Sequence, residues 1–250
     1  MTRVTSRLGA VHHNLLMDSK EYLDLLKQAY SLVSVLSDKN GAKVLRMRNC
    51  CVGKDLIVKH YISPVVAYEK LKHFKHPNLS EIYDTVLLSD GQIVLEEFID
   101  GISVAQVLQC GKYTYRGACQ VLRGVCAAVG ALHDMGIIHR DIKPENVMLT
   151  KSGTVKLIDL NATRQLVPNK DADTVILGTI GYAPPEQYGI GQSNARTDIY
   201  ALGVLLNVML TGEHPSKQLA KGKAGKIVQK CTLIDPDSRY PSVNKLIEAL

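Results

Sequence analysis

The sequence contains no tryptophan and only two phenylalanines among its 250 residues, although it contains 11 tyrosines. Aliphatic side chains must therefore fill most of any hydrophobic core. Hydrophobic residues make up 46% of the chain and charged residues 22%, a balance that excludes a disordered, collagen-like or coiled-coil protein. A chain of this length can bury a sizeable core without disulfides or metals, as one large domain or two modest ones.

Long apolar runs and a regular cysteine spacing are also missing. Charged residues interrupt even the most apolar segment, 117–138, so no run reaches the roughly 18 residues that a membrane helix needs. The six cysteines follow no disulfide framework and the chain shows no signal peptide, which together predict a protein of the reducing cytoplasm without a membrane segment. Cys119, Cys126 and His133 share a helix face, but each interval of seven residues rises about 10.5 Å, too far for one metal ion.

The net charge of +6 fits an acidic ligand as well as an ordinary solvated surface. No basic run is interleaved with aromatic residues, so we expect no nucleic-acid binding. The densest basic stretch, 217–230, holds five lysines and no acidic residue, and it is interpreted as a solvated face.

The pattern of apolar residues changes once along the chain. After a helical run that Ser19 is expected to cap, period-two runs up to residue 98 predict an antiparallel sheet, with a short helix that begins at Ser63–Pro64. Helical periodicity dominates from residue 102 onward. The sequence thus predicts an α+β fold with two lobes: an N-terminal extension with a helix over 1–29, a β-rich lobe over 30–98 and a mainly helical lobe over 102–250.

The segment 139–146, His-Arg-Asp-Ile-Lys-Pro-Glu-Asn, carries the strongest functional signal. Pro144 would break a helix, so the segment is expected to be a loop. Asp141 can accept a proton from an attacking hydroxyl, Asn146 can hold a divalent ion, and Lys143 can neutralise a phosphate. The segment resembles the catalytic loop of eukaryotic-type protein kinases, and its lysine resembles the Ser/Thr-specific branch of that family.

Two further segments resemble the same family. Asp159 ends an apolar strand 18 residues after Asp141, a natural place for a hard cation, and its Asp-Leu-Asn resembles the family's Asp-Phe-Gly. Lys59 ends another apolar strand and needs an anionic partner there. Glu69, on the short helix that follows, resembles the residue that forms this ion pair in active kinases.

The second half of the chain adds three elements of the resemblance. Residues 177–186 resemble the loop and Ala-Pro-Glu motif that form the platform for a polypeptide substrate, and Thr179 matches the residue that contacts the catalytic Asp and Lys. Glu186 is expected to form a buried ion pair with Arg239. Asp198 resembles the anchor beneath the catalytic loop.

Two departures from the family lie in the first lobe. The glycine-rich loop should fall on 37–44, where none of its three glycines is in register and only Gly41 lies nearby. Ile57 stands where the family usually has a small residue that lies over adenine. Glu96 takes the position of the family's gatekeeper residue and would be an acidic one, unless the alignment with the family is off by one residue.

The resemblance implies a serine/threonine protein kinase that uses ATP and Mg²⁺, or Mn²⁺, on a protein substrate. The implied catalytic residues are Asp141, Lys143, Asn146 and Asp159, of which Asn146 and Asp159 would hold the metal. The implied nucleotide-binding residues are Lys59, Glu69, Gly41, Val44, Ile57, Glu97 and Met148.

Other functions stay open. The lost glycines and the altered Asp-Leu-Asn favour a pseudokinase that acts as a nucleotide-binding or scaffolding module, whereas the intact charged residues favour an enzyme. A small-molecule phosphotransferase would use the same arrangement of Asp and Asn in the catalytic loop. It would not need the platform for a polypeptide substrate. Arg140 could pair with a phosphate on Thr174, and a dimer could support such autophosphorylation.

Overall fold

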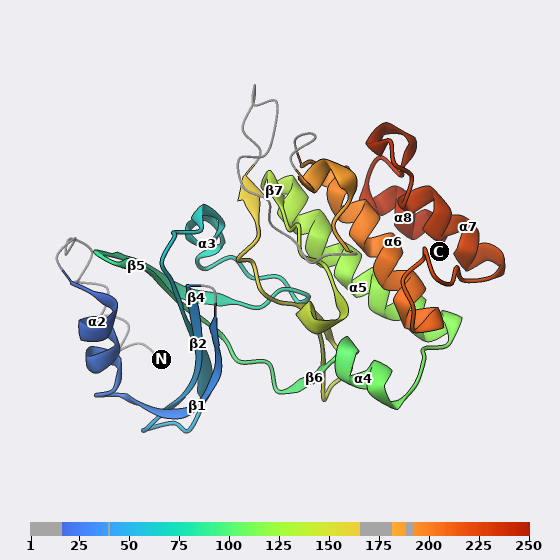
Figure 1. Cartoon of the computed structure of the whole chain (residues 1–250). Helices are drawn as coiled ribbons and strands as arrows, with labels where there is room; N and C mark the ends of the chain where they lie inside the picture. Colours follow the sequence, from blue (N-terminus) through green and yellow to red (C-terminus); the bar gives the residue numbers. More distant parts are fainter. Residues whose placement is uncertain (1–16, 40, 166–181, 189–192) are drawn as a thin grey trace. The chain divides into compact units, whose positions relative to one another are not determined.

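The computed structural model describes residues 17–39, 41–165, 182–188 and 193–250 (Figure 1). The chain divides into two structural units. The first runs to Phe74 and includes Glu81–Phe98, and the second comprises Lys75–Ser80 and Ile99–Leu250. This division differs from the predicted lobe boundaries mainly at residues 75–80, and those boundaries stay predictions.

An antiparallel sheet of five strands, in the order β1-β2-β3-β5-β4, forms the first unit. The strands are β1 (Tyr30–Lys39), β2 (Ala42–Asn49), β3 (Asp55–Tyr61), β4 (Ile82–Leu88) and β5 (Gly91–Glu97). Lys39 pairs with Ala42, so only two residues connect β1 to β2. Gly41, in this turn, has a φ of 73°, a left-handed conformation that glycine adopts without steric cost.

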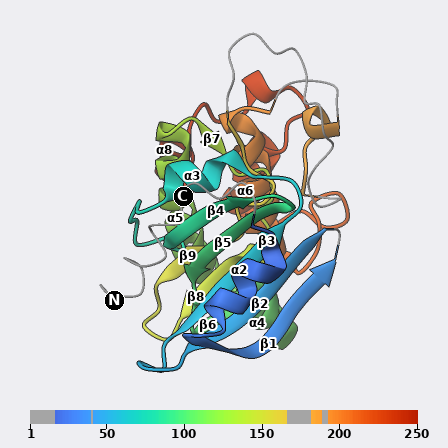
Figure 2. The ribbon, with the colours of Figure 1, turned by 90° about the vertical axis from the view of Figure 1, so that its left-hand side faces the viewer.

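Helix α2 (Ser19–Leu26) covers one face of this sheet (Figure 2). Its Tyr22 and Leu26 are 1% and 2% exposed. They pack in a cluster with Leu45, Met47, Leu56, Val58, Leu88, Ile93 and Leu95 of the strands. Successive strand residues point to opposite faces, so Lys59, which follows Val58, belongs to the other face. The helix predicted within an N-terminal extension is therefore part of the hydrophobic core of the first unit.

The N-terminus of α2 differs from the sequence prediction by one residue. Asp18 caps the helix, because its carboxylate accepts the N–H of Glu21 at 2.8 Å. Ser19, the predicted cap, instead donates through its N–H and its hydroxyl to the carboxylate of Asp90, which follows β4. The competing acceptor on the neighbouring turn explains why Ser19 does not serve as the cap.

The predicted start of the short helix is wrong. Helix α3 (Val66–Leu71) begins after Val65, which provides no side-chain cap, and not at Ser63–Pro64. The N–H of Val65 donates to Oε1 of Gln92 on β5 at 2.7 Å. This contact ties the backbone at the start of the helix to the side chain of a sheet residue.

The second unit is mainly helical, and the α+β fold class is confirmed. Its helices are α4 (Val104–Cys110), α5 (Tyr115–Asp134), α6 (Ala195–Thr211), α7 (Gly222–Cys231) and α8 (Val243–Ala249), with the 3₁₀ turns η2 (Pro144–Asn146), η3 (Pro185–Tyr188) and η4 (Pro236–Ser238). Short strands form the sheet β6-β8-β9 and the pair β10-β7. These strands are β6 (Gly101–Ser103), β7 (Ile137–Ile138), β8 (Val147–Thr150), β9 (Val155–Leu157) and β10 (Arg164–Gln165).

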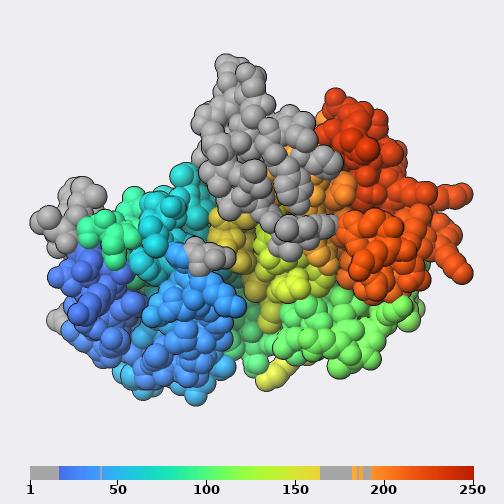
Figure 3. Space-filling model, viewed as in Figure 1, coloured from blue at the N-terminus to red at the C-terminus, as the bar shows by residue number. Residues whose placement is uncertain are grey.

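Helix α6 is buried almost all round, as its apolar sequence predicts. Asn194 caps it by accepting the N–H of Arg196 at 2.8 Å, and Gly212 ends it with a φ of 78°. Residues from α6 onward, orange to red in Figure 3, gather in one part of this unit's surface. Among the residues that the structure describes, no helix is both long and apolar enough to cross a membrane.

All six cysteines are free thiols. Cys119 and Cys126 lie on the buried face of α5, where the sequence predicts an apolar stripe. Burial raises the pKa of Cys126 to about 12, so this thiol behaves as a small apolar side chain at neutral pH.

Candidate active site

The loop between β7 and β8 brings together three of the predicted catalytic residues. Lys143 Nζ lies 2.7 Å from Oδ2 of Asp141, and both side chains are largely buried. Asn146 donates through Nδ2 to the backbone oxygen of Asp141 at 2.8 Å and to its carboxylate at 3.0 Å. Pro144 starts the turn η2, which returns the chain so that Asn146 meets Asp141. The predicted spacing therefore corresponds to direct contact.

Asp198, at the start of α6, holds the backbone at the beginning of the loop between β7 and β8. Its carboxylate, which is fully buried, accepts the N–H groups of His139 and Arg140, each at 2.9 Å. His133 of α5 contacts the same carboxylate at 2.8 Å. Burial alone would raise the pKa of Asp198, but the hydrogen bonds from His133 and the backbone hold that pKa below its ordinary value. Asp198 is therefore a charged anchor, as its resemblance to the family implies.

His139 lies between this anchor and the catalytic loop. It is fully buried, and its Nδ1 accepts the N–H of Asp141 at 3.3 Å. Burial lowers the pKa of His139, so the imidazole is neutral at pH 7 and can act as this acceptor. The loop backbone thus depends on a neutral histidine beside a charged aspartate.

Two residues of the site adopt a left-handed backbone conformation that costs a non-glycine residue about 1 kcal/mol or more. Arg140 has a φ of 71° and Asp159 a φ of 67°. The carbonyl of Arg140 accepts Nε2 of the buried Gln187 at 2.9 Å, which helps to hold the strained peptide. Sequence patterns assign no role to Gln187, since its only signal is that it follows Glu186.

Asp159 follows β9 and is connected to the catalytic loop through the backbone. The N–H of Ile158 donates to the carbonyl of Asn146 at 2.9 Å, and Leu160 is buried at 2% exposure. A carboxylate and an amide oxygen are hard ligands of the kind that Mg²⁺ and Mn²⁺ prefer. Because Asn146 uses its Nδ2 on Asp141, its amide oxygen is the atom suited to a cation. The residues present fit a divalent metal.

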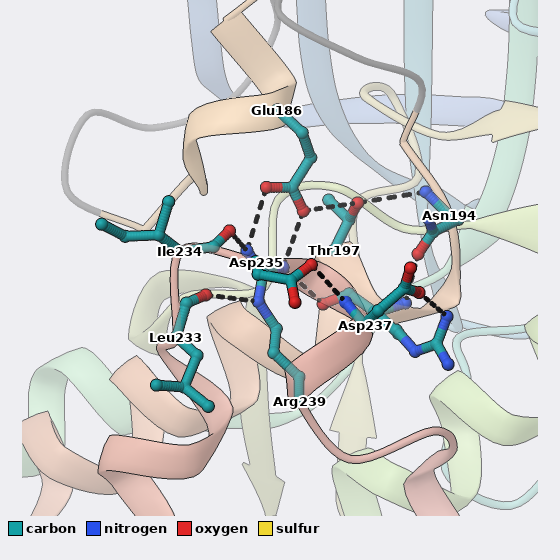
Figure 4. A network of polar contacts seen from close by, with 9 residues as sticks. Glu186, Asn194, Thr197, Leu233, Ile234, Asp235, Asp237 and Arg239 are labelled. Atoms are coloured by element: carbon teal, nitrogen blue, oxygen red, sulfur yellow. Dashed lines mark hydrogen bonds and ion pairs between the residues drawn. The ribbon is translucent and has the colours of Figure 1, made fainter.

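Glu186 and Arg239 form the predicted buried ion pair (Figure 4). Nη1 donates to Oε1 of Glu186 at 2.7 Å, and Nη2 donates to Oε2 at 3.0 Å. The guanidinium completes its five N–H contacts with the backbone carbonyls of Leu233, Arg196 and Ile234. Thr197 of α6 donates to the same glutamate at 3.3 Å. The pair therefore connects η3, α6 and the segment before η4.

In the first unit, the ion pair of Lys59 differs from the prediction. Nζ of Lys59 lies 2.7 Å from Oε2 of Glu96 on β5, and these side chains are 7% and 3% exposed. Glu69, the predicted partner, lies on the exposed side of α3. The sequence pattern could not identify Glu96, because the contact arises from strand pairing and not from a local spacing.

The other predicted nucleotide-binding residues fall at separate places. Val44 and Ile57 share the sheet face of Lys59, because Val44 pairs with Lys59 and Ile57 with Glu96. Gly41 occupies the tight β1–β2 turn, so residues 37–39 lie in β1 and 42–44 in β2 and form no wide loop. Glu97 ends β5.

The remaining predicted residues lie in the second unit or outside the described residues. Met148 of the second unit is half-buried in β8. Thr174 and Thr179 lie outside the described residues, so the predictions for the segment 166–181 are not addressed by this structure.

Comparison with known proteins identifies the family and several bacterial relatives. The family model for the protein kinase domain matches residues 54–249. The chain is 33% identical over 147 residues to "Probable serine/threonine-protein kinase PknB" of Lactococcus lactis, a match that covers 58% of this chain and 23% of that protein. "Serine/threonine-protein kinase PknB" of Mycolicibacterium smegmatis is 34% identical over 148 residues, 56% of this chain and 24% of the relative.

A longer match, to "Probable serine/threonine-protein kinase PknB" of Corynebacterium glutamicum, is 29% identical over 210 residues, 76% of this chain and 32% of that protein. The matches to the Lactococcus and Mycolicibacterium proteins span about a quarter of those relatives' own length. The family match begins at residue 54, after the β1–β2 hairpin in which the glycine pattern departs from the family.

Proposed function

Because the chain belongs to the protein kinase domain family, we propose that it is an ATP-dependent serine/threonine protein kinase. The observation that carries the proposal is the contact of Asp141 with both Lys143 and Asn146 in one buried loop. Phosphoryl transfer needs little covalent chemistry from the protein and depends on positioning and electrostatics, which this loop can supply.

Each residue of the loop has a distinct part in the proposal. Asp141 orients the substrate hydroxyl and accepts its proton, since Asn146 holds both its carboxylate and its backbone carbonyl. Lys143, 2.7 Å from that carboxylate, balances negative charge that develops beside it. Asn146 and Asp159 would hold Mg²⁺ or Mn²⁺ through oxygen atoms, and the metal would screen the phosphate charges of ATP.

The first unit supplies the nucleotide contacts in this proposal. Lys59 would bind phosphate oxygens of ATP, and Val44 and Ile57, on the same sheet face, would contact the base. Glu97 ends the strand at which the chain leaves the sheet, and Met148 stays a predicted nucleotide-binding residue.

Specificity for serine and threonine is supported by two observations. Lys143 stands two residues after Asp141, as in the Ser/Thr-specific branch of the family. The relatives from L. lactis, M. smegmatis and C. glutamicum all carry the words serine/threonine-protein kinase in their names. A protein substrate, location in the cytoplasm and a dimer for autophosphorylation complete the proposal.

A pseudokinase is the second candidate, and the tight β1–β2 hairpin favours it. Strand pairing uses backbone N–H groups on both sides of this turn, and Gly41 is the one glycine of the turn. A hairpin of this kind offers fewer amides to phosphate oxygens than a glycine-rich loop.

Transfer of labelled γ-phosphate from ATP to a generic protein substrate, followed by phosphoamino-acid analysis, tests the proposal. We expect phosphoserine and phosphothreonine with the natural chain, and a loss of at least about a hundredfold in Asp141→Asn. Nucleotide binding without transfer would favour the pseudokinase. Phosphotyrosine as the main product would contradict the assigned specificity.

A further inference from the structure

We propose that Glu96 is the carboxylate that positions Lys59 for nucleotide binding, in the place that the family pattern assigns to Glu69. The proposal rests on the proposed kinase function, and it changes which residue makes the phosphate-binding lysine competent. In this proposal Glu96 acts through Lys59, so it is a positioning residue and contacts no substrate.

The sheet itself brings the two side chains together. Lys59 on β3 lies opposite Val94 on β5, and Glu96 lies two residues further along β5, opposite Ile57. Directly opposed residues of antiparallel strands project from the same face, so Lys59 and Glu96 are diagonal neighbours on one face. The distance of 2.7 Å between Nζ and Oε2 is that of a close ion pair.

Burial makes this pairing necessary. Both side chains are almost completely removed from solvent, at 7% and 3% exposure. A buried ammonium without a counter-charge is strongly disfavoured, and a carboxylate in contact restores its charged form. A carboxylate at this distance favours the charged form of Lys59, which is the form that binds phosphate.

Helix α3 uses its inward face for apolar packing. The buried residues of this six-residue helix are Ala67, Tyr68 and Leu71. Tyr68 stacks on Tyr61 of β3 with ring centroids 5.7 Å apart, and the two hydroxyl oxygens lie 3.0 Å apart. Tyr61 shares the sheet face of Lys59, two residues away, so a tyrosine of α3 meets β3 while Glu69 remains exposed.

Because the partner carboxylate lies on β5 and not on α3, the ion pair of Lys59 does not depend on the position of α3. The register of β3 and β5 fixes the Lys59–Glu96 contact through backbone hydrogen bonds, whereas a helix-borne partner moves with its helix. The ion pair therefore stays intact whatever the position of α3, and a displacement of that helix would not switch off Lys59.

Steady-state kinetics of the 250-residue chain with ATP as the varied substrate test the proposal. We expect Glu96→Gln to lower kcat/KM for ATP by about 30-fold, with Glu96→Asp recovering at least a third of the natural activity. The fold-loss of kcat/KM in Glu69→Gln should be at least ten times smaller than the fold-loss in Glu96→Gln. Asp84→Asn is the matched control, because it breaks the partly buried pair of Asp84 on β4 with Lys72 at the end of α3, whose atoms lie 2.6 Å apart, and should leave kcat/KM unchanged.

A second measurement does not depend on catalysis. We would acylate the folded protein briefly with an acetylating reagent at pH 7.5 and quantify modification of Lys59 by mass spectrometry. Loss of the Glu96 carboxylate increases the neutral amine fraction, so Glu96→Gln should modify Lys59 at least about fivefold faster, and Glu69→Gln should not. This readout keeps its meaning even if no variant transfers phosphate, an outcome that would refute the kinase function alone.

Any of three results would overturn the role of Glu96. One is equal acylation of Lys59 in Glu96→Gln and in the natural chain. The second is a larger loss of kcat/KM in Glu69→Gln than in Glu96→Gln, and the third is a rise of kcat/KM in Glu96→Gln, which would make the contact inhibitory.

Discussion

The buried pair of Glu186 and Arg239 provides the sharpest stability prediction. Glu186→Gln keeps the shape of the side chain but removes its charge. Two charge-assisted hydrogen bonds, at 2.7 and 3.0 Å, are worth about 1.5–3 kcal/mol each, and the glutamine amide oxygen retains about 1 kcal/mol through one bond to the guanidinium, which is weaker because the acceptor is no longer charged. Arg239, whose side chain is fully buried, is left without a counter-charge. We therefore expect a loss of about 3–4 kcal/mol, within the range known for broken buried pairs.

Urea denaturation at pH 7.5, followed by far-UV circular dichroism, measures this loss, because the helical signal comes mainly from the second unit. Glu248→Gln is the matched control, since its ion pair with Lys245 is more than half exposed and should contribute less than about 1 kcal/mol.

A double-mutant cycle refines the test. Glu186→Met and Arg239→Met each leave one buried charge alone, whereas the double variant leaves none, so the double loss should fall short of the sum by at least about 2 kcal/mol. A loss of unfolding free energy below about 1 kcal/mol in Glu186→Gln would refute the conclusion that this pair stabilises the fold. A double variant whose loss equals the sum of the two single losses would refute it as well.

Three further predictions concern the core and the pH dependence. Leu26→Ala should destabilise the chain by about 2–4 kcal/mol in the same urea assay, because Leu26 of α2 is 2% exposed; a loss below about 1 kcal/mol would mean that α2 is not part of the core. Gly203→Ala should cost at least about 1 kcal/mol, since a Cβ would lie 2.3 Å from Cβ of Cys231 across the contact of α6 with α7, and a neutral change would contradict this packing. Burial lowers the pKa of His139 below 6.5, so the unfolded state binds the extra proton first and stability should fall as the pH drops below about 6.5. Thermal melting at pH 7.5 and 5.5 should show a smaller difference in His139→Asn than in the natural chain, and an equal difference would show that His139 is not responsible.

The catalytic loop was predictable because its chemistry is encoded in a short stretch. Asp141, Lys143 and Asn146 lie within six residues, and Pro144 forces the turn that brings them into contact. The fold class was predictable for a related reason, since apolar periodicity is a property of neighbouring residues.

Contacts between distant residues could not be predicted in the same way. Glu96 reaches Lys59 through the register of two strands, and the family pattern indicated Glu69 instead. Ser19 was a reasonable helix cap, but Asp90, 71 residues away, competes for its donors. Gln187 supports the strained Arg140 across 47 residues without any local signal. In each case the contact joins residues that are far apart in the sequence, and patterns of neighbouring residues carry no information about it.

The most direct test of the central claim is the initial rate of γ-phosphate transfer from ATP to a protein substrate, measured for the natural chain and for Asp141→Asn. Asparagine has nearly the same shape and can still interact with Asn146, but it cannot take the proton of the substrate hydroxyl. We predict measurable transfer by the natural chain and a rate at least about a hundredfold lower in the variant, with the melting temperature preserved. Equal rates in the two proteins would contradict the assignment of Asp141 as the catalytic base.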